Sequence, residues 1–194
     1  MNDSITKLPN FKFDPILLIA SMHQVERAVG WSENNQIALS CAPDDCTLSL
    51  QSAAHGAATC PSRVNGDIVR EDCWYDDFHP GFRHTYFYDI WKELRQQIRY
   101  AWRMRLMKLR PKGCLSFHED FYERYHIPII TNDRSFFFVN ETNEVPWPVD
   151  GVRVPSISTF HLPADGSVYQ VDTKKHHTVY NGGRTNRVHL VCSV

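Results

Sequence analysis

The stretch CLSFHEDFYERYHIPI, residues 114–129, places two possible metal ligands one residue apart. If the segment is extended, His118 and Asp120 project to the same side, because successive side chains of a strand alternate between its two faces. Two histidines and one carboxylate on one face of a metal ion form the ligand set of many non-haem iron enzymes. A second histidine must then come from a distant segment. The competing interpretation is a polar turn with a histidine–carboxylate hydrogen bond.

The stretch KKHHTVYNGGRTNRVHL, residues 174–190, offers that histidine. His176 and His177 precede a strand-like run, and Arg187 follows His177 by ten residues across an NGG turn. Adjacent residues of a strand face opposite ways, so only one of the two histidines should reach a metal. A guanidinium close to that metal can hold a carboxylate with two parallel hydrogen bonds.

The elements that position these residues follow from hydrophobic periodicity. Eight strand-like segments occur after residue 100, namely WRMRLMKL, CLSF, HIPIIT, SFFFVN, VPSISTFHL, SVYQV, HTVY and RVHLVCS. Helices are predicted at residues 14–30, with Asp14 as cap and Gly30 at the end, and at residues 86–101. We therefore expect an α+β chain, mainly β, with a double-stranded β-helix (jelly-roll or cupin-like) core and N-terminal and flanking helices.

The segment between the two helices has weaker signals. QIALSCA and TLSLQS, at residues 36–42 and 47–52, are short and strand-like. Residues 53–77 are rich in Gly, Ala, Ser, Asp and Pro with little periodicity, which predicts a long loop. Its glycine- and alanine-rich part, residues 53–66, is a candidate lid.

In order and spacing, these motifs resemble those of the 2-oxoglutarate-dependent Fe(II) oxygenases. The finer resemblance is to the aspartyl/asparaginyl β-hydroxylase group, with proline 3-hydroxylase and small phage-encoded members among its relatives. HED, RYHIPIITN, DGSVYQVDT and HHTVYNGGRTNRVHLV carry the resemblance, which covers residues 100–193 well and the N-terminal half loosely. It implies a single dioxygenase domain over residues 1–194, with core strands at about 100–193.

The resemblance implies that His118, Asp120 and His177 are the catalytic iron ligands. An arginine ten residues after the distal histidine belongs to the family pattern, and this interval favours His177 over His176. The animal aspartyl β-hydroxylases have glycine in place of the carboxylate ligand. Because this chain has Asp120, it resembles the members with three protein ligands.

The resemblance also implies a cofactor pocket. Arg187 would hold the distal carboxylate of 2-oxoglutarate, and Arg124 and His126 match the Arg-x-His positions that line the pocket. The implied cofactors are Fe(II) and 2-oxoglutarate, with O₂ as co-substrate. The implied reaction hydroxylates an unactivated C–H bond of an amino acid or of a peptide or protein side chain, and it releases succinate and CO₂.

Two other classes of function stay open. A cupin-like metalloenzyme, such as an isomerase, can use a His-Asp-His site without 2-oxoglutarate, although Arg187 would then have no assigned task. A non-catalytic binding module can keep the fold for recognition alone. The intact set of three ligands argues against a binding module.

Composition limits which partners and which cellular compartment we expect for this chain. The chain has 194 residues and a formal net charge of -1, which gives no general argument for nucleic acid or an anionic membrane. No apolar run is long enough to predict a membrane span, and residues 1–15 lack the pattern of a signal peptide. The six cysteines form no C-x-x-C pair, so we expect mostly free thiols in a cytoplasmic protein.

A basic stretch at residues 95–112 holds seven Lys or Arg residues and no acid, with Tyr100 and Trp102 between them. Basic and aromatic residues together are typical of a groove for single-stranded nucleic acid. Arg103 and Arg105 alternate with apolar residues, however, as in any half-buried strand, and we expect a solvated face here. Nucleic acid is therefore not expected as a partner, although an anionic substrate or an acidic protein surface would use the same residues.

Overall fold

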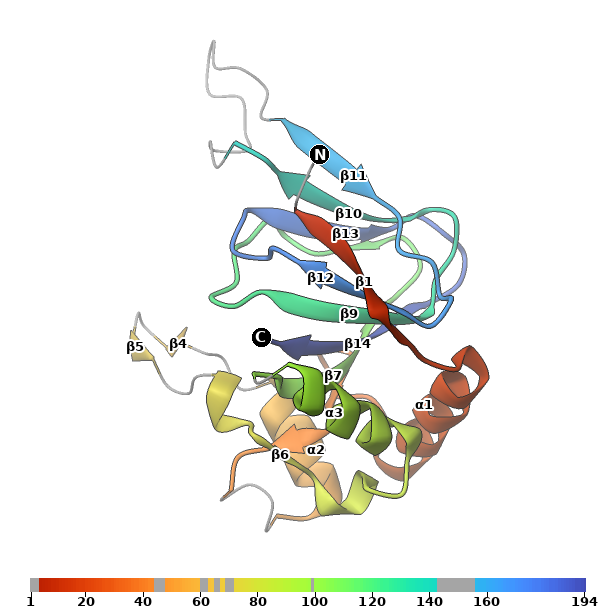
Figure 1. The fold of residues 1–194 in the computed structure, drawn as a ribbon, viewed down its shortest axis with the longest axis vertical. Helices are drawn as coiled ribbons and strands as arrows, with labels where there is room; N and C mark the ends of the chain where they lie inside the picture. The colour runs from red at the N-terminus through yellow and green to blue at the C-terminus, as the bar shows by residue number, and fades with distance from the viewer. Residues whose placement is uncertain are drawn as a thin grey trace.

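Two antiparallel sheets and three α-helices make up the described part of the chain (Figure 1). The computed structural model describes residues 4–43, 48–59, 63–64, 67–68, 72–98, 100–142 and 156–194. The larger sheet has the order β1-β12-β9-β14-β7-β2, and the smaller sheet has the order β11-β10-β13-β8. This double-sheet arrangement confirms the mainly β, jelly-roll fold class predicted from the sequence.

After residue 100 the strands match the predicted segments, except that CLSF (residues 114–117) is strand only at Cys114. The larger sheet consists of β1 (Ile5–Lys12), β12 (Ser167–Val171), β9 (Arg124–Ile130), β14 (Arg187–Ser193), β7 (Trp102–Leu109) and β2 (Gln36–Ala38). The smaller sheet consists of β11 (Ile157–Phe160), β10 (Ser135–Asn140), β13 (His177–Asn181) and β8 (Gly113–Cys114). Two short pairs complete the strands: β3 (Ser40–Cys41) with β6 (Asp77–Phe78), and β4 (Arg63–Val64) with β5 (Asp67–Ile68).

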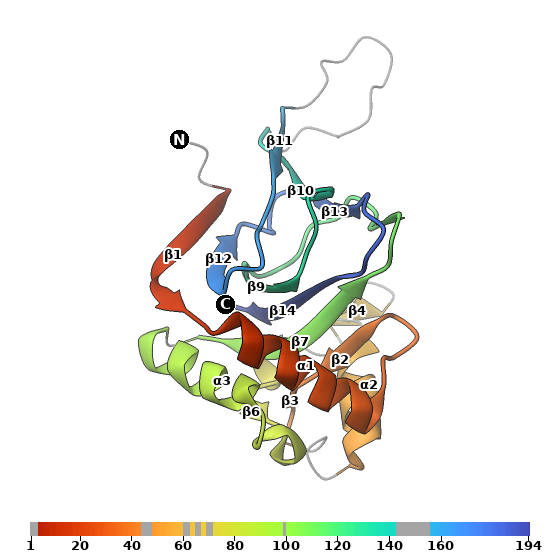
Figure 2. The same cartoon turned by 90° about the vertical axis from the view of Figure 1, so that its right-hand side faces the viewer.

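All three helices lie on one side of the larger sheet, and the smaller sheet lies on the other (Figures 1 and 2). They are α1 (Pro15–Val29), α2 (Leu50–Thr59) and α3 (Tyr86–Gln97), with short 3₁₀ turns η2 (Asp72–Trp74) and η3 (Pro80–Phe82) between α2 and α3. Asp14 caps α1, since its Oδ1 accepts a hydrogen bond from the Ile16 N–H at 2.8 Å. Gly30 follows the helix with a φ of 68°. Both termini of this helix are therefore as predicted.

Alternation sorts the side chains of the three central strands into two environments. Leu106 of β7, Ile127 of β9 and Leu190 of β14 belong to the large apolar core shared with the helices. The residues next to them face the space between the sheets. A smaller apolar cluster occupies part of that space and contains Phe137, Leu162, Tyr169, Val171 and Val179. The remainder of the space is available for polar side chains.

The first half of the chain differs from the predictions in two places. Residues 50–59 form α2, where the sequence pattern predicted a strand and then a loop. Alanine is the best helix former, and Ala53 and Ala54 bury their side chains against the core, which explains the helix. The remainder of the candidate lid lies largely outside the described residues. The edge strand β1 was not predicted, because Pro9 interrupts its pattern and is tolerated only at a sheet edge or bulge.

The cysteines follow the prediction with one exception. Cys114 and Cys192 are free thiols, whereas Cys41 is disulfide-bonded. The expectation of free thiols is therefore wrong for Cys41. In the part of the chain that the structure describes, no helix has the length and apolar character to cross a membrane.

Candidate metal centre

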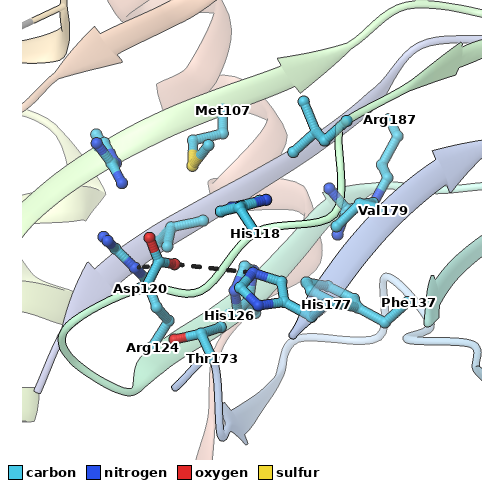
Figure 3. Close-up of a pocket in the computed structure, with 13 residues that line it drawn as sticks. Met107, His118, Asp120, Arg124, His126, Phe137, Thr173, His177, Val179 and Arg187 are labelled. Atoms are coloured by element: carbon cyan, nitrogen blue, oxygen red, sulfur yellow. Dashed lines mark hydrogen bonds and ion pairs between the residues drawn. The ribbon is translucent and has the colours of Figure 1, made fainter. Parts of the chain in front are cut away.

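His118, Asp120 and His177 come together between the sheets, and one potential ligand atom of each lies within 4.8 Å of the others (Figure 3). Backbone pairing brings the two histidines together. The His118 N–H donates to the His177 carbonyl at 3.1 Å, and the His177 N–H donates back at 2.9 Å. Asp120 lies beyond any strand, and its N–H donates to the Thr173 carbonyl at 2.8 Å. The predicted strand through His118 and Asp120 is therefore only a single bridge, yet both side chains converge.

Both histidines are held in the tautomer that suits a metal ligand. Nδ1 of His118 lies 2.8 Å from the Ser116 carbonyl oxygen, and Nδ1 of His177 lies 3.0 Å from that of Lys175. A carbonyl only accepts, so each Nδ1 carries the hydrogen and each Nε2 keeps its lone pair. Burial lowers the pKa of His177, which favours the neutral imidazole. Two such nitrogens beside a carboxylate fit a divalent transition metal.

His176 takes no part in this cluster. Its Nδ1 lies 2.6 Å from Oε1 of Glu119, on a partly exposed surface. Alternation along the chain therefore separates the two adjacent histidines, as predicted. Among the described residues, His177 is the histidine of this pair that faces His118 and Asp120.

A chain of buried charges supports Asp120 from behind. Arg124 donates from Nε to Asp120 Oδ2 at 2.9 Å and from Nη1 to Ser193 Oγ at 2.9 Å. The same Nη1 lies 3.3 Å from Asp72 Oδ2. Arg103 closes the chain by donating from Nη1 to the other oxygen of Asp72 at 2.6 Å. The orientation of Asp120 therefore depends on a carboxylate from a different region of the chain, in η2.

The carboxylates of Asp120 and Asp72, the two acids of this buried charge network, are held ionised. Burial alone raises the pKa of Asp120, but the charge and hydrogen bond of Arg124, with His177 and Arg105, more than offset burial and lower it. Burial also raises the pKa of Asp72, and the nearby arginines and the Ser193 hydroxyl bring it down to about 2. A metal at the cluster would therefore meet an anionic Asp120 at neutral pH.

A pocket that opens to solvent is lined by the three residues and Arg187. Arg187 is buried, and its guanidinium carbon lies 5.1 Å from the centroid of the Phe137 ring. Its Nη2 donates to Nδ1 of His189 at 3.0 Å. Within the described ranges no carboxylate pairs with Arg187. Burial lowers its pKa to about 9, so it remains a cation at neutral pH. The pocket thus contains an uncompensated positive charge.

The other two predicted cofactor residues also line the pocket. The guanidinium of Arg124 is already bonded to Asp120, so it orients that carboxylate. The ring of His126 packs edge-on against Phe137, with centroids 4.9 Å apart, and its Nδ1 lies 3.4 Å from that of His189. Burial and the nearby arginines lower the pKa of His126 well below its usual value, which keeps it neutral. Their direct binding of a cofactor stays a prediction.

Three polar residues at or behind the site were not singled out from the sequence as site residues. Arg105 lines the pocket and Arg103 supports Asp72, and both are buried. The expectation of a solvated face at these two positions is wrong, because both faces of β7 are covered. Asp72 was also missed. It lies within the stretch of residues 53–77, which has little periodicity, and no local signal there indicates Arg124, 52 residues away, as a partner.

No protein-family model and no curated protein matches the sequence. Among solved structures, an oxidoreductase of the 2OG-Fe(II) oxygenase family from Burkholderia pseudomallei aligns over 98% of this chain and 84% of its own, at 14% identity and a TM-score of 0.52. The non-haem monooxygenase ThoJ, described as a nickel complex, aligns over 98% and 73%, at 12% identity and a TM-score of 0.48.

A third similar structure is CapF, a capsular polysaccharide assembling protein from Staphylococcus aureus. It is 12% identical over 46% of this chain, with a TM-score of 0.35, and the match spans only 23% of its own length. TM-scores below 0.5 support no argument, so the comparison rests on the Burkholderia protein. At 14% identity that likeness establishes a shared fold and leaves the chemistry to the residues of the site.

Proposed function

We propose that this chain is an Fe(II)- and 2-oxoglutarate-dependent dioxygenase, most similar to the aspartyl/asparaginyl β-hydroxylases. His118, Asp120 and His177 would hold the iron. When bound, Fe(II) and 2-oxoglutarate supply the chemistry that uses O₂ to hydroxylate an unactivated C–H bond and releases succinate and CO₂. The substrate would be an amino acid or a peptide or protein side chain, by analogy with the resembled family.

The observation that carries the proposal is the position of Arg187. A buried cation is costly unless an anion accompanies it. Arg187 lines the same pocket as the three ligand residues, and among the described residues no acid compensates it. A carboxylate that also reaches the metal would satisfy both the cation and the open coordination positions. 2-Oxoglutarate has a keto-acid end for the metal and a distal carboxylate for the arginine.

The protein's own groups have defined tasks in this proposal. Arg124 orients Asp120, and the two carbonyls behind His118 and His177 fix the ring tautomers. Phe137 covers one face of the Arg187 guanidinium and shields it from water. Shielding strengthens the attraction between this cation and a ligand carboxylate.

Anaerobic titration tests the proposal. Fe(II) and 2-oxoglutarate together should produce a visible metal-to-cofactor absorption band in the native chain. Arg187→Met should weaken 2-oxoglutarate binding by about tenfold to a hundredfold, the range expected for a charge-assisted hydrogen bond. Arg184→Met is the matched control, because Arg184 is exposed in the turn before β14, and it should bind like the native chain.

The outcomes separate the competing functions. Metal binding that is indifferent to 2-oxoglutarate would contradict the proposal and favour a cupin-like enzyme that uses the same three ligands. A native chain that binds neither Fe(II) nor 2-oxoglutarate would favour a non-catalytic binding module. A band that Arg187→Met leaves unchanged would remove the assigned role of Arg187.

A further inference from the structure

Arg105 is a second buried arginine of the same pocket. It lies in the middle of β7, is only 8% exposed, and lines the pocket together with the three ligand residues. In the pairing of β7 with β14, Arg105 lies opposite Val191 and Leu109 lies opposite Arg187. Four residues of an antiparallel strand span about 13 Å, so the two arginines are anchored well apart along the pocket.

The two arginines belong to different ends of the site. Arg105 is close enough to Asp120 to be among the charges that lower the pKa of that carboxyl. Arg187 lies on the far side of His118 from Asp120 (Figure 3). A single small dicarboxylate held at Arg187 would therefore leave the end near Asp120 to another ligand.

The acids near Arg105 are already engaged with other arginines. Arg103 pairs with Asp72, and Arg124 pairs with both Asp72 and Asp120. Within the described ranges Arg105 forms no ion pair, and its buried Nε–H has no hydrogen-bond acceptor. Three arginines thus share two carboxylates, which leaves one positive charge in excess. A metal ion on Asp120 would increase that excess.

We infer that Arg105 binds a carboxylate of the substrate, so that the pocket holds the cofactor's anion at one end and the substrate's anion at the other. This inference rests on the proposed function and adds the substrate class: an acid. A guanidinium binds a carboxylate through two parallel hydrogen bonds, and the free Nε–H of Arg105 can supply one of them. The carboxylate can be the α-carboxylate of a free amino acid or the side chain of an acidic residue in a peptide.

Calorimetric titration with defined probes distinguishes these sources. The probes are free L-aspartate and L-proline, with their α-amides, and a short end-capped peptide with aspartate or asparagine at its centre. Each is added to the chain with Fe(II) and 2-oxoglutarate under anaerobic conditions. We expect at least one carboxylate probe to bind better than its amide. Arg105→Met should reduce that binding by about tenfold to a hundredfold and leave 2-oxoglutarate binding within twofold.

Lys108→Met is the matched control. It removes a cation from β7 on the face that contacts Trp31, outside the pocket, and it should leave binding of the probes unchanged. Thermal unfolding provides a second readout. Arg105→Met should melt at the native temperature or above, because it removes an unpaired buried charge, whereas Arg103→Met should melt lower. A lower melting temperature for Arg105→Met would mean that a carboxylate of the protein already forms an ion pair with Arg105, and it would overturn the inference.

Other results also overturn it. The inference fails if the native chain binds no carboxylate probe, if it binds acids and amides equally, or if Arg105→Met loses 2-oxoglutarate binding. The last result would assign Arg105 to the cofactor. Failure of the proposed function would appear separately, as absence of the iron–2-oxoglutarate band. The carboxylate titration can still be read in that case, because calorimetry does not depend on the band.

Discussion

His118 and His177 form a reciprocal backbone pair, with N–H···O distances of 3.1 and 2.9 Å, and their ring centroids are 4.4 Å apart. A pair of this kind fixes the separation of the two candidate ligands through the main chain. The side chains need only the correct rotamers, which the carbonyls behind each Nδ1 favour. Asp120 differs, because it lies beyond the strands: its N–H bonds to the Thr173 carbonyl, but its carboxylate is oriented by the Arg124 side chain.

Loss of the Arg124 side chain should weaken metal binding. Arg124→Gln removes the hydrogen bond that orients Asp120, and we expect Fe(II) or Mn(II) affinity to fall by about tenfold to a hundredfold. The measurement is anaerobic metal titration, with Arg134→Gln as an exposed control. If Arg124→Gln does not fold, Arg124→Lys keeps a charge but lacks the planar fork that reaches two carboxylates. Native metal affinity in both Arg124 variants would contradict this role.

Asp72 should make the free energy of unfolding of the native chain depend on pH in the acid range. Its pKa is about 2 in the folded chain against a usual value of 3.8, so its ionised form stabilises the fold above about pH 4. That contribution is lost as the pH falls from 3.8 towards 2. The free-energy gap between the native chain and Asp72→Asn should shrink by roughly 2 kcal/mol over this range. Urea unfolding at several pH values measures the gap, and a gap independent of pH would refute the prediction.

Gly166 and Gly56 should respond oppositely to alanine. Gly166 has a φ of 82°, and a Cβ there would lie 1.8 Å from the Phe13 carbonyl oxygen, so Gly166→Ala should lower the free energy of unfolding by at least about 1–3 kcal/mol. Gly56 lies within α2 with open space around it, so Gly56→Ala should raise that free energy by about 0.5–1 kcal/mol. Chemical denaturation of both variants tests this. Equal effects would show that the backbone at Gly166 can adjust.

Most strands after residue 100 were predictable because they have a buried face, and burial of one face imposes a period of two on the sequence; β8 and β11 contain no buried residue. The same periodicity misled the interpretation of Arg103 and Arg105. Alternation indicates that two faces differ, but it does not tell whether the polar face meets water or a second layer. Here the polar face of β7 meets the interior of the jelly roll. Only the second sheet, assembled from strands distant in the sequence, distinguishes a solvated arginine from a pocket arginine.

The convergence of His118, Asp120 and His177 was predictable because their spacing is constrained by the chemistry they would share; their role as metal ligands stays a prediction. Asp72 was not predictable, because its contribution depends on a tertiary contact with Arg124 and Ser193 that no local pattern encodes. The helix at Leu50–Thr59 was missed for a different reason. Short alanine-rich segments have little periodicity, and packing against the core decides whether they form a helix.

The most direct test of the account compares two adjacent histidines. His177→Ala and His176→Ala each remove one imidazole, yet only His177 faces His118 and Asp120. Fe(II) and 2-oxoglutarate are added anaerobically to each variant, and the metal-to-cofactor absorption band is recorded. We expect the native band for His176→Ala and loss of the band for His177→Ala. A band that survives in His177→Ala, or that disappears in His176→Ala, would contradict the proposed metal centre.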